Sequence, residues 1–488
     1  MTGKVVLKFI LGVVGAFVLL VVLLAAYILI DLSPDEAPSP RDKYLVNDIT
    51  QLNPIHVAEV VEPKSIQDIQ NAIAATSGKV SIGGGRYSQG GQVALDDHLH
   101  LDMRQFNKVV SFNPQHRKIT VQSGMRWRDI QEVIDPENLS IKIMQSYSNF
   151  TVGGSLSVNV HGRYMGEGPI IRSVKSIKIV LADGSVVSAS PTSNTEIFYG
   201  VIGGYGGLGV IAEATLELVP NEKISRETEY MTLAQYAVFF QNDIKNNPDV
   251  VFHNGNIYPP DYTHVSSVSW VKTDKSLTVQ DRLIPRDKDY WWQPKTAKFV
   301  ADSDFGKWMR QHVFEPIQHS SNAVQWRNHE ASLDVRELEP KSRKHQTYVL
   351  REYFVPVERF DSFSAKMATI FQKHDVNVLN VSIRHALPDT GSLLAWAREE
   401  VFAFVVYYRQ GTSQQDREKV QAWSREMIDA AISEGGAYYL PYQLHATTEQ
   451  FHNAYPQADA FFALKKKLDP NNRFSNKLWE QHYGYHSE

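Results

Sequence analysis

Three glycine-rich stretches constrain the fold of this chain more than any other feature of its sequence. They read "GGGRYSQGG" at residues 83–91, "TVGGSLSVNVHG" at 151–162 and "GGYGGLG" at 203–209. Glycine lets a backbone turn tightly and approach another group closely, because it has no side chain that would collide. The first stretch taken alone is equally consistent with a flexible turn. Three such stretches within about 130 residues instead predict one large, flat, phosphate-bearing ligand that lies along all of them.

The third stretch imitates a dinucleotide-binding fingerprint. Gly204, Gly206 and Gly209 satisfy the pattern G-x-G-x-x-G. That pattern binds a pyrophosphate only when a helix follows the glycines. Residues 210–218 alternate between apolar and other side chains, which predicts a strand, so we reject a Rossmann-type site. The sequence also contains neither a Walker A motif nor a His-Glu-x-x-His zinc motif.

A long apolar segment precedes these stretches. Phe9–Ile30 contains 22 residues without a charge, which as a helix would measure about 33 Å and cross a bilayer core of roughly 30 Å. A cleaved signal peptide is the alternative, but its apolar core is shorter and small residues follow it. We therefore predict a single-pass anchor, followed by a linker at 33–43. Lys4 and Lys8 precede the segment, so the positive-inside rule places the body on the extracytoplasmic side.

Composition excludes several classes of function. Lysine and arginine number 50 and aspartate and glutamate 54, for a net charge of −4, so we expect no nucleic-acid partner. The chain has no cysteine, which excludes disulfides, thiolate nucleophiles and cysteine-ligated zinc. Its 488 residues exceed what one hydrophobic core organises, so we expect two domains or one nested in another.

The glycine-rich stretches and the segments around them resemble a known family. "GGGRYSQGG", "FTVGGSLSVNVHGRYMGEGPIIRSVKSIKIVLADGSVV" and "NTEIFYGVIGGYGGLGVIAEATLELV" are similar to the PCMH-type FAD-binding domain of the vanillyl-alcohol oxidase superfamily. The similarity is greatest to the alditol and aldonolactone oxidases and to decaprenylphosphoryl-ribose oxidase. It implies an α+β fold with an FAD-binding domain of two subdomains and a cap domain built on an antiparallel sheet. We place the boundaries at 1–43 for the anchor and linker, 44–220 for the FAD domain, 221–430 for the substrate (cap) domain and 431–488 for a segment that returns to the FAD domain.

The resemblance also implies which residues hold the flavin. The glycine-rich loop at 83–91 would surround the pyrophosphate, and the stretch at 151–162 would lie along the flavin. Ile211 would lie beside the adenine. Relatives often carry a histidine that bonds covalently to the flavin where this chain has Tyr87, so we predict non-covalent FAD. The cofactor-binding residues expected in this way are Gly83, Gly84, Gly85, Arg86, Tyr87, Ser88, Gly91, Ser146, Thr151, Val152, Gly153, Gly154, Val158, Asn159, Val160, His161, Ile211 and Tyr439.

Three further residues are expected to act in catalysis: Tyr442, Arg384 and His161. Arg384 matches the arginine of a Glu-x-Arg pair that contacts the substrate in polyol and lactone oxidases, but Ser382 replaces its glutamate. Tyr442 takes the place of a reactive lysine, and we expect it to act as base or to orient a hydroxyl with help from a cationic neighbour, either Arg384 or His445. His161 would sit beside the isoalloxazine. We expect no metal, and "KKK" at 465–467 is predicted to be a solvated helix face.

The predicted reaction follows from the cofactor. A hydroxyl-bearing carbon of a sugar, polyol, aldonolactone or lipid-linked glycosyl substrate would pass hydride to flavin N5, while a base takes the hydroxyl proton. The sequence does not choose between oxygen and a quinone as electron acceptor. Two alternatives stay open: a flavin-dependent reductase of a C=C bond, and a non-catalytic subunit of an envelope complex.

Overall fold

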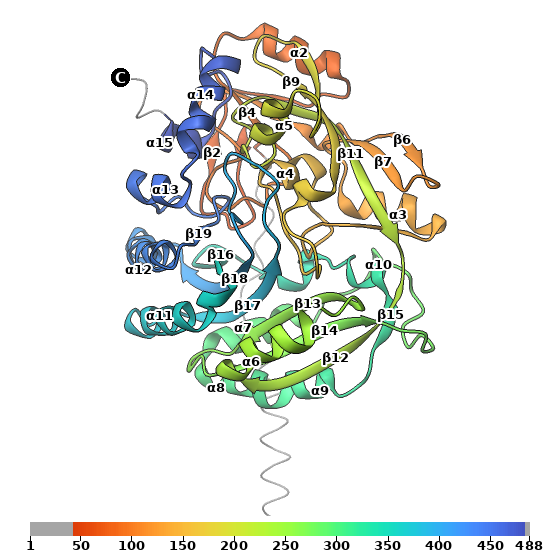
Figure 1. The fold of residues 1–488 in the computed structure, drawn as a ribbon. Coiled ribbons are helices and arrows are strands. Elements are labelled where there is room, and N and C mark those ends of the chain that lie inside the picture. The colour runs from red at the N-terminus through yellow and green to blue at the C-terminus, as the bar shows by residue number, and fades with distance from the viewer. Residues whose placement is uncertain (1–41, 484–488) are drawn as a thin grey trace, which may run out of the picture.

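The computed structural model describes residues 42–483 (Figure 1). In this range the chain forms one small ribbon and three larger sheets with helices packed on them, so the fold is α+β, as predicted. None of the helices within 42–483 combines the length and the apolar character that a bilayer crossing requires. The predicted anchor, Phe9–Ile30, lies outside the described residues.

The first sheet is parallel and carries the first glycine-rich loop at its edge. Its strand order is β3-β5-β4, and the loop follows directly from β4. Ser65 is the N-cap of helix α2, where Ser65 and Asp68 form a reciprocal capping box. The elements of this region are β1 (Leu45–Val46), β2 (Ile55–His56), β3 (Glu59–Val61), α2 (Ile66–Ala75), β4 (Val80–Gly83) and β5 (Leu99–Asp102).

The second sheet is antiparallel and contains the strand that follows the third glycine-rich stretch. Its order is β10-β9-β11-β7-β6, with β8 paired to β11, so the prediction of a strand after Gly209 is confirmed. Its elements are β6 (Val109–Asn113), β7 (Lys118–Gln122), α3 (Trp127–Ile134), β8 (Leu139–Ile141), α4 (Val152–Ser157), β9 (Val174–Val180), β10 (Val186–Ala189), α5 (Thr195–Val201) and β11 (Val210–Pro220).

The third sheet has eight strands and faces the glycine-rich loops. Its order is β15-β12-β14-β13-β17-β18-β16-β19. One apolar core runs through this sheet and the second one, and α11 and α12 cover one face of its central strands (Figure 1). The elements are β12 (Lys223–Thr232), α6 (Leu233–Phe239), β13 (Val250–Ile257), β14 (His264–Lys272), β15 (Val324–Trp326), α10 (Arg327–Glu330), β16 (Gln346–Pro356), α11 (Phe360–Lys373), β17 (Val378–Ala386), β18 (Val401–Gly411), α12 (Gln414–Ser433) and β19 (Ala437–Tyr438).

Two helical segments complete the fold. One connects β14 to β15 and consists of α7 (Gln293–Asp302), α8 (Asp304–Met309), the π-helical turn η5 (Arg310–Phe314) and α9 (Glu315–His319). The other follows β19 and consists of α13 (Thr448–Ala454), α14 (Ala458–Leu468) and α15 (Lys477–His482). After α14 the chain runs beside β4, where Val80 and Phe474 form a parallel bridge.

The prediction for "KKK" is wrong at one of its three residues. Lys466 and Lys467 are exposed, but Lys465 is fully buried and its ammonium lies 3.0 Å from the equally buried Asp469 carboxylate. Lys465 also donates to the carbonyls of Gly207 and Phe474, each at 2.8 Å. The lysine therefore ties the C-terminal segment to the third glycine-rich stretch.

Candidate functional site

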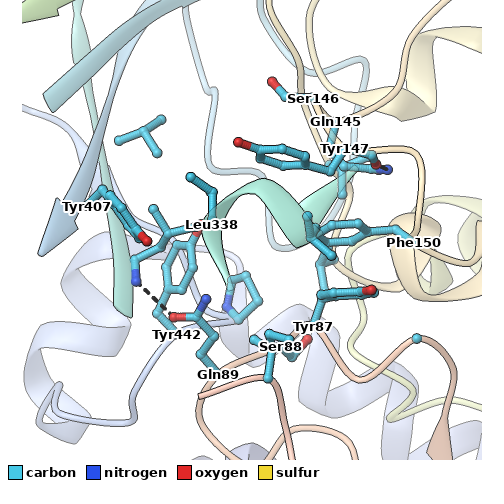
Figure 2. Close-up of a pocket in the computed structure, with 18 of the residues that line it drawn as sticks. Tyr87, Ser88, Gln89, Gln145, Ser146, Tyr147, Phe150, Leu338, Tyr407 and Tyr442 are labelled. Carbon is cyan, nitrogen blue, oxygen red and sulfur yellow. Dashed lines mark hydrogen bonds between the residues drawn. The ribbon is translucent and has the colours of Figure 1, made fainter. Parts of the chain in front are cut away.

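A cavity of about 1000 Å³ lies between the glycine-rich loops and the eight-stranded sheet. Figure 2 shows Tyr87, Phe150 and Tyr147 on one side of it and Tyr407 and Tyr442 on the other. Its volume is at the upper end of the range for ligand pockets, which suits a large cofactor and a substrate together.

The first two glycine-rich stretches form one wall because they approach each other very closely. A Cβ atom on Gly84 would lie 2.2 Å from Oγ1 of Thr151, so no larger residue fits there without displacing the loop. The same hydroxyl accepts a hydrogen bond from the Gly85 amide at 3.2 Å. The backbone of this loop is therefore fixed against the start of α4.

The loop presents unused donors to the cavity. Arg86, Tyr87 and Ser88 line the cavity, and Arg86 has a left-handed conformation with φ of 62°. Within residues 42–483, the amides of Arg86, Tyr87 and Ser88 donate to no backbone or side-chain acceptor. Successive free amides in such a turn form a concave site for an anion. This arrangement fits the pyrophosphate of the expected cofactor.

Several buried polar side-chain atoms along the cavity also lack a partner. Buried polar groups are nearly always hydrogen-bonded, so several unpaired polar atoms in one cavity indicate a bound ligand. In the part of the chain that the structure describes, the unpaired atoms on the cavity wall are Arg86 Nε, Ser123 Oγ, Ser146 Oγ, Gln293 Oε1, Arg384 Nε and Tyr407 Oη. They extend from the glycine-rich loop to the eight-stranded sheet, so the residues present fit a dinucleotide that spans both walls.

Most residues predicted from the sequence line this cavity. Three do not, and they lie behind its wall: Gly91 packs against Lys477, Val152 is in the core, and the Asn159 amide donates to Asp389 at 2.7 Å. The predicted residues on the wall are Gly83, Gly84, Gly85, Arg86, Tyr87, Ser88, Ser146, Thr151, Gly153, Gly154, Val158, Val160, His161, Ile211, Arg384, Tyr439 and Tyr442.

The opposite wall is one face of the three central strands β16, β18 and β17. Glu352 is paired with Val405, and Val405 is paired with Ser382, so these three residues form one cross-strand row. Residues two apart on a strand share a face, which places Arg384 beside this row. The carboxylate that the resemblance leads us to expect at Ser382 is therefore supplied from the same row, two strands away, by Glu352.

Glu352 is the centre of a buried hydrogen-bonded cluster. One of its carboxylate oxygens lies 2.6 Å from Nε2 of His161, and the other accepts the hydroxyl of Tyr442. Burial raises the pKa of Glu352, but the charge of His161, the guanidinium of Arg384 and the Tyr442 hydrogen bond outweigh it and hold this pKa below its ordinary value of 4.5. The cluster therefore keeps an ionised carboxylate in the cavity at neutral pH.

Tyr442 does not have the properties of a base. Burial and the neighbouring Glu352 carboxylate raise the pKa of its phenol well above 10, and Arg384 opposes this only partly. His445, the other cation considered, is bonded instead to Arg351 and to Ser424. Of the two roles expected for Tyr442, base or orienting group, the structure therefore favours the second, because its hydroxyl donates a hydrogen bond that Glu352 accepts.

Sequence reasoning missed Glu352 and a second polar pair. The Tyr147 hydroxyl donates to Glu337 at 3.0 Å, and both side chains line the cavity. Figure 2 shows Tyr147 and Tyr407 reaching into the same hollow from opposite sides. A signal for Glu352 was present, because Arg351 and Glu352 are two charged residues inside the mostly apolar strand "TYVLREYFVP".

Known proteins resemble the chain in both halves of the cavity. A family model described as an FAD binding domain matches residues 57–190. L-gulonolactone oxidase of Mus musculus is 21% identical over 430 residues, which cover 86% of this chain and 94% of the relative.

Two plant proteins match a shorter part. L-galactono-1,4-lactone dehydrogenase 1, mitochondrial, of Oryza sativa subsp. japonica is 26% identical over 290 residues, 58% of this chain and 45% of the relative. The Arabidopsis thaliana L-galactono-1,4-lactone dehydrogenase, mitochondrial, is 24% identical over 275 residues, 55% of this chain and 45% of the relative.

Proposed function

We propose that this FAD-dependent oxidoreductase, which is similar to aldonolactone oxidases and dehydrogenases, oxidises a hydroxyl of an aldonolactone or a similar sugar or polyol. The observation that carries the proposal is the ionised Glu352 held by His161 and Tyr442 in a cavity that the FAD-binding loops share.

The side chains that line the cavity have separate roles in the proposed reaction. FAD, when bound, supplies the acceptor for the hydride of the carbinol carbon. Glu352 takes the proton of the substrate hydroxyl, and the O–H electron pair becomes the second bond of the carbonyl. The Tyr442 hydroxyl and the Arg384 guanidinium orient the substrate oxygen beside the carboxylate. Tyr147 and Glu337 offer a donor and an acceptor for a further hydroxyl of the same substrate.

The location of the enzyme belongs to the proposal as well. We propose that Phe9–Ile30 anchors the chain in a membrane with its body on the extracytoplasmic side, because this segment is uncharged and Lys4 and Lys8 precede it. A lipid-linked glycosyl substrate and either oxygen or a quinone as acceptor are compatible with this arrangement.

Anaerobic flavin reduction tests the proposed activity. The FAD-loaded chain is mixed without oxygen with L-gulono-1,4-lactone, L-galactono-1,4-lactone, simple polyols and glycosyl phosphates. We expect at least one lactone to bleach the flavin absorbance. If no hydroxyl compound in the panel bleaches it while dithionite does, the proposed chemistry is wrong.

We expect the FAD to be held without a covalent bond. Tyr87 occupies the position at which relatives attach the flavin. Its ring stacks on that of Phe150, with 4.1 Å between the two ring centroids. Acid precipitation should leave the yellow colour in the supernatant. A pellet that retains flavin fluorescence after washing would contradict this prediction.

Arg384 is expected to contribute mainly to substrate binding. Its Nε has no partner among the described residues and lines the cavity. Loss of a charge-assisted hydrogen bond costs about 1.5–3 kcal/mol, so Arg384→Met should raise KM for the lactone about tenfold or more. Arg384→Lys, which keeps the charge, should recover part of the loss. Equal KM values for wild type and Arg384→Met in steady-state assays would place the guanidinium away from the substrate.

A further inference from the structure

An unusual concentration of exposed apolar side chains lies on the segment between β14 and β15. Eleven large apolar side chains are exposed within residues 42–483, and five of them fall between 291 and 317. Their exposed fractions run from 45% to 67%. We call these five residues the apolar lip: Trp291, Trp292, Phe305, Trp308 and Ile317.

The lip is exposed although its segment is firmly attached to the fold. Arg310 in η5 donates to the Asn380 side chain of β17 at 2.9 Å and pairs with Glu315 at 2.5 Å. The Tyr258 hydroxyl donates to the same glutamate at 2.5 Å. Phe299 of α7 is buried behind the lip. The side chains of the lip are therefore exposed on a segment that is well packed against the rest of the fold.

The cavity opens through the lip. Trp292 and Ile317 are both exposed at the surface and part of the cavity wall. Figure 1 shows α8 and α9 at the end of the molecule opposite α2, so the lip occupies one end of the body. A molecule that enters from this end meets apolar rings before it reaches the polar cluster around Glu352.

Near its start, the described chain also contacts β16, the strand whose Tyr348 packs against this segment. The Thr347 hydroxyl donates to the carbonyl of Thr50 at 2.8 Å, and the next residue, Tyr348, packs against Ala301 of α7. Residues 31–41 span at most about 40 Å when fully extended. The length of residues 31–41 therefore limits how far the end of Phe9–Ile30 can be from residue 42 to about 40 Å.

We propose that the apolar lip rests on the surface of a lipid bilayer and opens the cavity toward it; the inference rests on the membrane anchoring proposed above. Large exposed apolar patches mark interaction surfaces, and tryptophan is enriched where protein meets the membrane–water interface. Three of the five lip residues are tryptophans. A molecule dissolved in the membrane would then reach the cavity without crossing water.

Tryptophan emission of the full-length, FAD-loaded chain tests this contact. Residues 1–41 contain no tryptophan, so the signal comes from the body alone. Three of its nine tryptophans are in the lip, and five others are buried. The chain is reconstituted in phosphatidylcholine vesicles with plain or brominated acyl chains, since bromine quenches only indole rings that contact the lipid.

We expect brominated lipid to quench the wild type. The double variant Phe305→Glu/Ile317→Glu keeps every tryptophan, and its emission should return toward the level in plain vesicles while the chain still floats with them. The matched control Val110→Glu/Val186→Glu changes exposed valines on β6 and β10 and should be quenched like the wild type.

Three results would overturn the proposal: no quenching of a chain that floats, equal quenching of both double variants, or a chain that does not float at all. The last result would also remove the proposed anchor. Lactone-driven flavin reduction in the same samples reports separately on the proposed activity, so the two failures are distinguishable.

Discussion

Replacing Glu352 by glutamine should slow flavin reduction by the lactone about 10²–10⁴-fold at saturating substrate, which is the usual cost of removing a general base. The amide keeps the size of the side chain and can still pair with His161 and Tyr442, but it cannot take a proton. FAD content and the unfolding midpoint should stay near those of the wild type. Single-turnover rapid mixing without oxygen measures the effect.

The pH dependence gives an independent readout. Because the pKa of Glu352 is held below its ordinary value of 4.5, the carboxylate stays ionised down to that pH, and the wild-type rate should fall only in more acidic solution, as the pH drops through the lowered pKa. The flavin-reduction rate of Glu352→Gln should not show this fall at low pH. Tyr442→Phe removes only an orienting hydrogen bond, so it should slow reduction less than Glu352→Gln. A wild-type rate in Glu352→Gln, or a larger loss in Tyr442→Phe, would contradict the assignment of Glu352 as base.

Replacing Lys465 by methionine should destabilise the protein by about 3–5 kcal/mol, the typical cost of removing one partner of a buried ion pair. The change leaves the Asp469 carboxylate buried without its cation and removes the donor to the carbonyls of Gly207 and Phe474. Because Gly207 belongs to the third glycine-rich stretch, FAD retention should weaken as well. Urea unfolding followed by tryptophan and flavin fluorescence measures both effects.

Lys466 provides a matched control one residue away. Its side chain is exposed on the same helix, so Lys466→Met should change stability by no more than about 0.5 kcal/mol. If both substitutions lowered the urea midpoint equally, the loss would come from helix α14 in general and not from the buried pair.

The parts of the fold that follow local rules were predictable from the sequence. The strand after Gly209 follows from alternation of apolar residues, and the helix start at Ser65 follows from a capping box whose partner lies three residues on. The proximity of the first two glycine-rich stretches follows from their composition, since only glycine leaves room for Thr151 beside Gly84.

The parts that depend on distant pairing were not predictable. Glu352 reaches the site because β16 lies beside β18 and β18 beside β17, and no local pattern encodes that strand order. Lys465 becomes buried because the chain after α14 folds back along β4, where its partners lie at Gly207 and Phe474. The three consecutive lysines alone do not indicate that the first of them is buried.

We expect the substrate hydroxyl to meet the Glu352 cluster inside the cavity. A crystal structure of FAD-loaded Glu352→Gln, soaked with a lactone that reduces the wild type, tests it most directly because the slow variant retains unreacted substrate. We predict a carbinol oxygen within hydrogen-bonding reach, about 2.6–3.2 Å, of the side chain at position 352 or of the Tyr442 hydroxyl. A lactone bound in the cavity with every hydroxyl beyond the reach of both groups would contradict the account.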